Sequence, residues 1–310
     1  MAKASARSSG AVSTAELFDP AFLEAVGRLH LVAKRVARGG RPAEQRSRDL
    51  GSGIEFRDYR PYSPGDDFRA IDWNIYRRLG RVFLRLFEEL EDLPVYLAPD
   101  ISESAFHAGG SAEDTPRART GLRAAFALAS IALHQHDKVG IFPFGDDLRV
   151  ALRPQSGRGK TMRIAETLAG LRPEGRTDFR RAFHRFANLG LREGLLVVIS
   201  DFLDPAGIEA IRDALGSQRH RLLLVPLWRA TDRDPSITGD VELVDCESGE
   251  REDVSITPQI LARVREAHDI FHAELLAFAR RRGAGVLRLD CDAELIPQLA
   301  DLFEGGRYEA

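Results

Sequence analysis

Three oxygen-bearing side chains stand at alternate positions in Asp100-Ile101-Ser102-Glu103-Ser104, directly after the apolar run 94–98. One carboxylate and two hydroxyls at the end of an expected strand are the hard oxygen ligands that Mg²⁺ and similar divalent cations prefer. The same residues also suit the start of a helix, because Asp and Ser side chains accept hydrogen bonds from free backbone N–H groups. The pentapeptide by itself leaves both interpretations open.

The elements that must position these residues alternate between strand and helix from Pro94 onward. Runs such as Leu195 to Ile199 are almost continuously apolar, which is typical of strands covered by helices on both faces. The pattern predicts an α/β fold with a doubly wound, mostly parallel sheet. Strands are expected at 95–99, 138–144, 148–152, 195–200, 221–227 and 286–289, and helices at 117–136, 161–171, 178–188, 205–215, 258–282 and 293–303.

Two further oxygen ligands fall where such a sheet forms its binding sites, outside the carboxyl ends of the strands at the switch point of strand order. Thr177 precedes the expected helix 178–188, and Asp201 follows the expected strand 195–200. If no cation bound there, three separate loops would carry oxygen ligands at the same edge of the sheet by chance. We therefore expect one edge of the sheet to hold a divalent cation with the ligands Asp100, Ser102, Ser104, Thr177 and Asp201.

The part of the chain before this pattern is organised differently. Residues 1–18 are expected to form a disordered tail, and residues 19–92 an N-terminal helix followed by a β-rich segment. Asp19 is the expected N-cap of that helix, with Pro20 in its first turn. Two β-rich runs, 70–76 and 81–87, predict a hairpin around Leu79-Gly80. Residues 93–310 are expected to form the α/β domain, with a small hairpin inserted near 241–254.

Composition limits the classes of partner and the compartment. The formal net charge of −3 gives no overall attraction to nucleic acid or to an anionic membrane. Two cysteines, Cys246 and Cys291, are too few for a disulfide scaffold. The N-terminus lacks the apolar core of a signal peptide, and no run approaches the roughly 18 apolar residues of a membrane span. We therefore expect a cytoplasmic protein with no transmembrane segment and no nucleic-acid partner.

The motifs together resemble a known bacterial family. An Asp-x-Ser-x-Ser, a later Thr and an Asp after a following strand are similar to the metal-ion-dependent adhesion site (MIDAS) of von Willebrand factor A domains. The segment 51–89, above all Tyr59 to Trp73, resembles the signature of the bacterial domain of unknown function 58 (DUF58). The resemblance covers roughly residues 19–303. It implies a von Willebrand A-like domain and partnership with a MoxR-type AAA+ ATPase.

The resemblance also implies roles for the candidate ligands. Ser102, Ser104 and Thr177 would offer hydroxyl ligands, and Asp100 and Asp201 would bind Mg²⁺ directly or through water. Mg²⁺ takes about six oxygens, so a position remains for an acidic side chain of a partner protein. We expect a metal-dependent protein-interaction module, an adaptor or co-chaperone of a MoxR-like ATPase, without a complete catalytic constellation.

Two enzymatic alternatives use parts of the same sequence. A Mg²⁺-dependent phosphohydrolase of the haloacid dehalogenase type would use Asp100 as its nucleophile, but Ser102 stands where that family has its general acid. The run from Pro154 to Thr161 ends like a nucleotide-binding Walker A loop, but Pro154 stands where the first glycine belongs. The phosphohydrolase is the alternative that we retain beside the binding module.

Overall fold

The computed structural model describes residues 17–39, 55–63, 66, 71–88, 93–107 and 115–304. Backbone contacts divide the chain into two units, one of Met1–Gly39 and Leu93–Ala310 and one of Gly40–Asp92. Helix α2 (Pro20–Gly39), which we expected to belong with residues 40–92, is therefore part of the larger unit. Leu17 and Phe18 were expected in the tail, but both are buried, and the Phe18 ring lies 4.6 Å from that of Phe126.

A seven-stranded sheet forms the centre of the larger unit, with the strand order β10-β7-β6-β3-β4-β5 and with β11 paired to β7. Its pairs are parallel except for the edge pair of β4 with β5. The expected α/β class with a mostly parallel sheet is confirmed. The strands are β3 (Val95–Pro99), β4 (Val139–Ile141), β5 (Leu152–Gln155), β6 (Leu195–Ser200), β7 (Arg221–Trp228), β10 (Gly285–Val286) and β11 (Leu289–Asp290).

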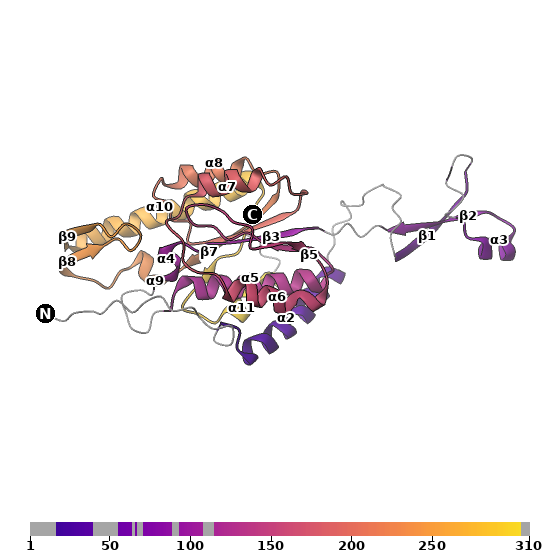
Figure 1. Cartoon of the computed structure of the whole chain (residues 1–310), viewed down its shortest axis with the longest axis horizontal. Coiled ribbons are helices and arrows are strands. Elements are labelled where there is room, and N and C mark those ends of the chain that lie inside the picture. Colours follow the sequence, from indigo (N-terminus) through magenta and orange to yellow (C-terminus); the bar gives the residue numbers. More distant parts are fainter. Residues whose placement is uncertain are drawn as a thin grey trace. The chain divides into compact units, whose positions relative to one another are not determined.

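Helices cover both faces of this sheet, with α2, α5, α6 and α11 on one side and α7, α8 and α10 on the other (Figure 1). The short helices α4 and α9 lie at the same end of the unit as the hairpin of β8 and β9 (Figure 1). The bounds are α4 (Glu103–Phe106), α5 (Arg117–His134), α6 (Thr161–Ala169), α7 (Phe179–Ala187), α8 (Ile208–Gly216), α9 (Ala230–Arg233), α10 (Pro258–Arg282) and α11 (Leu295–Glu304).

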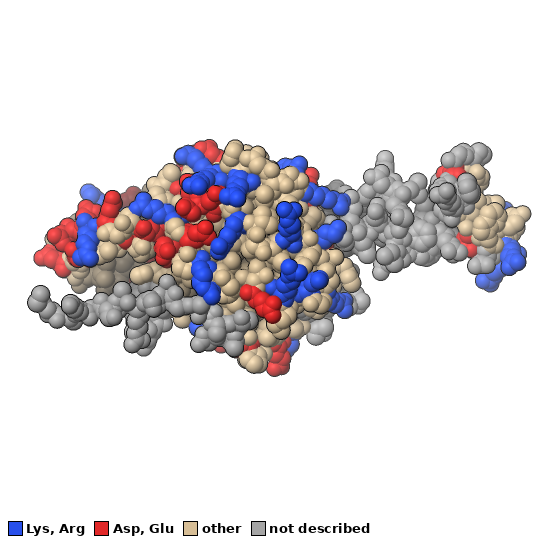
Figure 2. Space-filling view, in the orientation of Figure 1, with Lys and Arg blue, Asp and Glu red and all other residues tan. Residues whose placement is uncertain are grey.

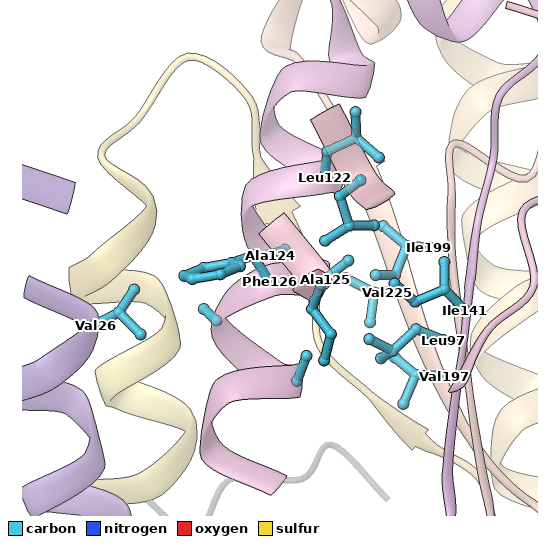
Figure 3. Packing of buried hydrophobic residues seen from close by; sticks show 14 of the residues in the cluster. Val26, Leu97, Leu122, Ala124, Ala125, Phe126, Ile141, Val197, Ile199 and Val225 are labelled. Carbon is cyan, nitrogen blue, oxygen red and sulfur yellow. The ribbon is translucent and has the colours of Figure 1, made fainter. Parts of the chain in front are cut away.

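Each face of the sheet has its own hydrophobic core. On one face, Leu122 and Phe126 of α5 pack between the strands and Val26 of α2 (Figure 3). On the other face, aromatic rings dominate, and Phe144 packs edge-on against Phe179 with 5.2 Å between ring centroids. Each Å² of apolar surface removed from water contributes about 25 cal/mol. The carboxyl ends of the strands are therefore held in place from both sides.

Two of the secondary-structure elements predicted from the sequence are wrong. The strand expected at 148–152 is β5 at Leu152–Gln155, an antiparallel edge strand. The hairpin expected around Leu79-Gly80 is absent from the described residues of the smaller unit, because Trp73–Leu79 is helix α3. The strand β2 (Phe83–Glu88) pairs instead with β1 (Glu55–Pro61). Asp72 explains the helix, since its Oδ1 accepts the N–H of Ile75 at 3.2 Å and caps the first turn.

The small hairpin near 241–254 consists of β8 (Gly239–Val244) and β9 (Arg251–Ile256), with Val244 opposite Arg251. Most side chains of both strands are exposed. The hairpin is thus a ribbon inserted between α9 and α10 that contributes little to either core.

Candidate metal centre

The switch point of the sheet lies between β3 and β6. The chain passes from β3 to β4 on one side and later enters β6 on the other side of β3. Pro99 of β3 is level with Ile199 of β6, and the N–H of Asp100 donates to the carbonyl of Ile199 at 2.8 Å. The two residues that follow these strands, Asp100 and Asp201, are therefore neighbours across the switch point, where the sequence placed them.

Pro99 does not disrupt this end of β3. Its own carbonyl accepts the N–H of Phe144 at 3.1 Å, and the N–H of Ile101 donates to the carbonyl of Phe144 at 2.7 Å. The hydrogen-bond ladder thus continues on both sides of the missing proline donor. The loop that carries the Asp-x-Ser-x-Ser motif leaves the sheet from a regularly paired position.

The loop before α7 is joined to the same place by backbone hydrogen bonds. The N–H of Glu103 donates to the carbonyl of Gly175 at 2.9 Å, and the N–H of Glu174 donates to the carbonyl of Ile101 at 2.7 Å. Gly145, after β4, permits this approach, because a Cβ there would lie 2.1 Å from the carbonyl oxygen of Glu174. Thr177 is thereby carried on a loop that is bonded directly to the loop of Asp100.

Ser102 and Ser104 serve both interpretations of the motif. Their hydroxyl oxygens lie 3.0 Å apart, so the two side chains point toward each other. Ser102 is also the N-cap of α4, where its Oγ accepts the N–H of Ala105 at 3.4 Å. That distance is longer than the usual 2.7–3.2 Å of a strong N–H···O bond, so the capping bond is weak. The Ser102 hydroxyl retains capacity to bind a ligand.

Asp100 is a buried carboxylate whose two oxygens are both hydrogen-bonded. Oδ1 accepts the N–H of Ser102 at 2.9 Å, and Oδ2 accepts the hydroxyl of Ser200 at 2.5 Å. Burial raises the pKa of Asp100 to about 7, and the negative charge of Asp201 adds to that effect, whereas the bonds from Ser200 and Ser102 oppose it. A bound cation would offset both unfavourable effects, because it supplies a nearby positive charge.

Asp201 belongs to the same electrostatic group. Its Oδ1 accepts the N–H of Leu203 at 3.0 Å. Burial raises the pKa of the Asp201 carboxyl, the Arg117 guanidinium opposes this, and the charges of Asp232 and Glu247 add to it. Two neighbouring carboxylates that are both difficult to ionise mark this edge of the sheet as a candidate functional site.

The turn after Asp201 contains a strained residue. Phe202 has a φ of 62°, a left-handed conformation that is unfavourable for a bulky side chain. Its ring is fully buried and stacks on Phe179 at 5.6 Å, and its N–H donates to the Ser200 hydroxyl at 2.9 Å. Core packing and this hydrogen bond thus fix the turn that carries Asp201.

The Thr177 hydroxyl is the candidate ligand whose lack of a hydrogen-bond partner is clearest. Only 3% of the residue is exposed, and its Oγ1 has no hydrogen-bond partner among the described residues. Burying a hydroxyl without a partner costs about 1–3 kcal/mol. Within the described ranges, no group of three or more His, Cys, Asp or Glu could hold a metal ion, so a cation here would depend on the hydroxyls. The set of hydroxyls and carboxylates fits a hard divalent cation.

Two residues of this region were not predicted from the sequence. Ser200 stands directly before Asp201 and level with Asp100, so the register of β3 and β6 is the signal that could have found it. Glu247, in the turn of the β8–β9 hairpin, accepts the hydroxyl of Ser104 through Oε1 at 2.7 Å. The two residues are 143 positions apart, and no spacing in the sequence indicates this contact.

The enzymatic alternatives gain no support from this geometry. The residue two positions after Asp100 is the hydroxyl-bearing Ser102, and both oxygens of Asp100 already accept hydrogen bonds. The run that resembles a Walker A motif begins within the antiparallel edge strand β5, and the hydroxyl of Thr161 donates to the carbonyl of Arg158 at 2.9 Å. A phosphate-binding loop instead joins a parallel strand to a helix.

The fold and this site define a doubly wound α/β protein with hydroxyl and carboxylate groups at its switch point. Residues 58–273 match the model of the family described as "Protein of unknown function DUF58", and the chain belongs to that family. An uncharacterized protein of Mycobacterium tuberculosis, Rv1480, is 27% identical over 301 residues, which cover 95% of this chain and 93% of the relative.

Solved structures with a similar fold include two of interest. An aerotolerance-related membrane protein from Bacteroides fragilis is 15% identical, with a TM-score of 0.41 and coverage of 69% of this chain and 97% of the other. A von Willebrand factor type A protein from Catenulispora acidiphila is 12% identical, with a TM-score of 0.38 and coverage of 72% and 43%, respectively.

The expectation of a cytoplasmic protein is corrected by these findings. It was based on two cysteines and on the lack of a long apolar run, but the similar structure from Bacteroides fragilis is described as a membrane protein. Low cysteine content and the lack of a long apolar run do not by themselves assign the compartment. No helix in the described part of the chain is long and apolar enough to cross a membrane.

Proposed function

We propose that this chain is a protein-interaction module that binds an acidic side chain of a partner through a divalent cation at the carboxyl ends of β3 and β6. The observation that carries the proposal is the convergence of three loops on one place, joined by hydrogen bonds, with the buried and unpaired hydroxyl of Thr177 among them. The cation would be held by Asp100, Ser102, Ser104, Thr177 and Asp201.

The chemistry follows from the donor set. Hydroxyl and carboxylate oxygens favour Mg²⁺ or another hard cation, which when bound supplies a positive centre for a carboxylate from outside. The protein groups would fix the place of that centre, because both cores hold the strands that precede Asp100 and Asp201. Partner recognition would then depend on the cation and on the acidic residue together.

The partner that we propose is a MoxR-type AAA+ ATPase, for which the chain would act as an adaptor or co-chaperone. Membership of the DUF58 family and the sequence resemblance described above support this choice. The test is recovery of the purified ATPase on the immobilised full-length chain. ATPases themselves need Mg²⁺, so variants rather than a chelator decide the outcome.

The double variant Ser102→Ala/Ser104→Ala lacks two of the proposed cation ligands and is expected to bind the ATPase at least about tenfold more weakly, a loss of about 1.4 kcal/mol. It should therefore recover at most about 10% of the ATPase that the wild type recovers. Ser217→Ala, at the C-terminal end of α8, is the matched control and is expected to retain recovery. Equal recovery by all three proteins would contradict a cation-mediated contact with the ATPase.

A further inference from the structure

The β8–β9 hairpin reaches the candidate metal centre through one side chain. Glu247 lies in the turn of the hairpin, and its Oε1 accepts the hydroxyl of Ser104 at 2.7 Å. The Ser104 hydroxyl in turn lies 3.0 Å from that of Ser102. A carboxylate therefore already contacts the hydroxyl pair at which a carboxylate from a partner would be expected.

The turn is built to present Glu247 in one place. Asp245 accepts the N–H of Glu247 through Oδ1 at 2.8 Å and the hydroxyl of Ser248 through Oδ2 at 2.6 Å. Gly249 closes the turn with a φ of 71°, and its N–H donates to the carbonyl of Asp245 at 2.8 Å. These bonds fix the backbone on both sides of Glu247, so little conformational entropy is lost when its carboxylate binds.

The surroundings of Glu247 are acidic, which is unfavourable for another carboxylate. Figure 2 shows acidic side chains gathered over the β8–β9 hairpin. Asp245 and Glu250 lie in the same turn as Glu247, and Ser104, which Glu247 contacts, stands four residues after the buried carboxylate of Asp100. Like charges at close range repel, and a divalent cation between them would turn this repulsion into attraction.

The hairpin can leave the site without large loss of buried surface. Five of six positions in β8 and four of six in β9 are exposed. A two-stranded ribbon with exposed side chains is only marginally stable and opens at low free energy compared with the core. Displacement of Glu247 would therefore break its bond to Ser104 and leave the two cores intact.

We propose that Glu247 is an internal carboxylate ligand of the metal centre, which closes the site until the acidic side chain of a partner replaces it. This inference rests on the proposed function, because it assumes that a cation binds among the hydroxyls and carboxylates. It adds that the β8–β9 hairpin regulates access, and that the partner competes with a residue of this chain for one coordination position.

The test uses the full-length chain, Mn²⁺ as a paramagnetic substitute for Mg²⁺ and acetate as a simple carboxylate. Water-proton relaxation of protein-bound Mn²⁺ reports how many exchangeable waters the ion carries. Wild type is compared with Glu247→Gln and with Glu250→Gln, which removes the same charge from the exposed end of the same turn. Each protein is first loaded with Mn²⁺ and then titrated with acetate.

Glu247→Gln is expected to bind Mn²⁺ more weakly and to show one more exchangeable water than the wild type. If Glu247 occupies the position in about nine-tenths of wild-type molecules, acetate should bind Glu247→Gln about tenfold more tightly. Glu250→Gln should behave as the wild type does.

Two results would overturn the inference in different ways. If all three proteins bind Mn²⁺ and show the same water count and acetate response, Glu247 is not a ligand, while the proposed function stands. If none of the three binds Mn²⁺, the metal centre itself is refuted, and the proposed function fails together with the inference.

Discussion

Replacing Thr177 by Val separates a metal-ligand role from a structural one, because the two side chains have the same shape. The Thr177 hydroxyl is buried and unpaired within the described structure, at a cost of about 1–3 kcal/mol. Val removes the hydroxyl and keeps the packing. Without divalent cations, Thr177→Val should therefore raise the free energy of unfolding by about 1–2 kcal/mol, measured by urea denaturation in EDTA.

With Mg²⁺ the stability advantage of the variant should largely disappear. A cation at a hundredfold excess over its Kd stabilises the wild type by about 2.7 kcal/mol. If loss of the Thr177 hydroxyl weakens cation binding tenfold, the same Mg²⁺ concentration adds only about 1.4 kcal/mol to the variant. The gain on adding Mg²⁺ should thus fall by about half, while the metal-free variant is more stable.

Ser130→Ala is the matched control for this experiment. Ser130, in α5, is 1% exposed, and its hydroxyl likewise has no partner among the described residues, but it lies outside the loops of the metal centre. Its variant should respond to Mg²⁺ as the wild type does. If Thr177→Val is destabilised in EDTA and keeps the full response to Mg²⁺, the assignment of the Thr177 hydroxyl as a ligand is wrong.

Three further predictions follow from the loops and from helix α10. Gly145→Ala should destabilise the protein by about 1–3 kcal/mol and reduce its thermal response to Mg²⁺, because the new Cβ would meet the Glu174 carbonyl oxygen at 2.1 Å. The control Gly159→Ala has open space around its Cβ and should change neither the stability nor the response to Mg²⁺. Phe202→Gly should be more stable in urea than Phe202→Ala by about 1 kcal/mol, because only glycine accepts a φ of 62° without strain; the opposite order would disprove backbone strain at this turn. Burial, together with the charges of neighbouring basic groups, lowers the pKa of His272 to about 4. The unfolded state therefore binds more protons than the folded state between pH 4 and 6.5. As the pH drops through that window, the free energy of unfolding should fall by about 1 kcal/mol, a figure reduced for the partial exposure of the ring. A His272→Gln variant should lose this part of the pH dependence, and an unchanged curve would show that His272 is not its source.

The order of strands and helices in the larger unit could be predicted because both cores impose a simple pattern. A strand such as β6 is buried along almost its whole length and reads as a continuous apolar run, and α10 begins and ends at the predicted residues Pro258 and Arg282. The error around residues 70–87 has a physical cause. The aromatic and β-branched residues there favour a strand, but the cap supplied by Asp72 decides for a helix.

The site could be predicted in part for a related reason. Asp100 and Asp201 end two parallel strands, so topology alone brings them to one edge of the sheet. Glu247 could not be found in this way, because it reaches Ser104 from an exposed hairpin whose position depends on tertiary contacts. Nor does the sequence show that the Thr177 hydroxyl is unpaired, since this depends on how the loops around it pack.

The most direct test of the metal centre is anomalous diffraction from crystals of the full-length protein grown with Mn²⁺. The account predicts one strong anomalous peak within bonding distance of the hydroxyl oxygens of Ser102 and Ser104, and no such peak in crystals of Ser102→Ala/Ser104→Ala. A wild-type crystal soaked to saturation with Mn²⁺ that shows no peak beside these hydroxyls would contradict it.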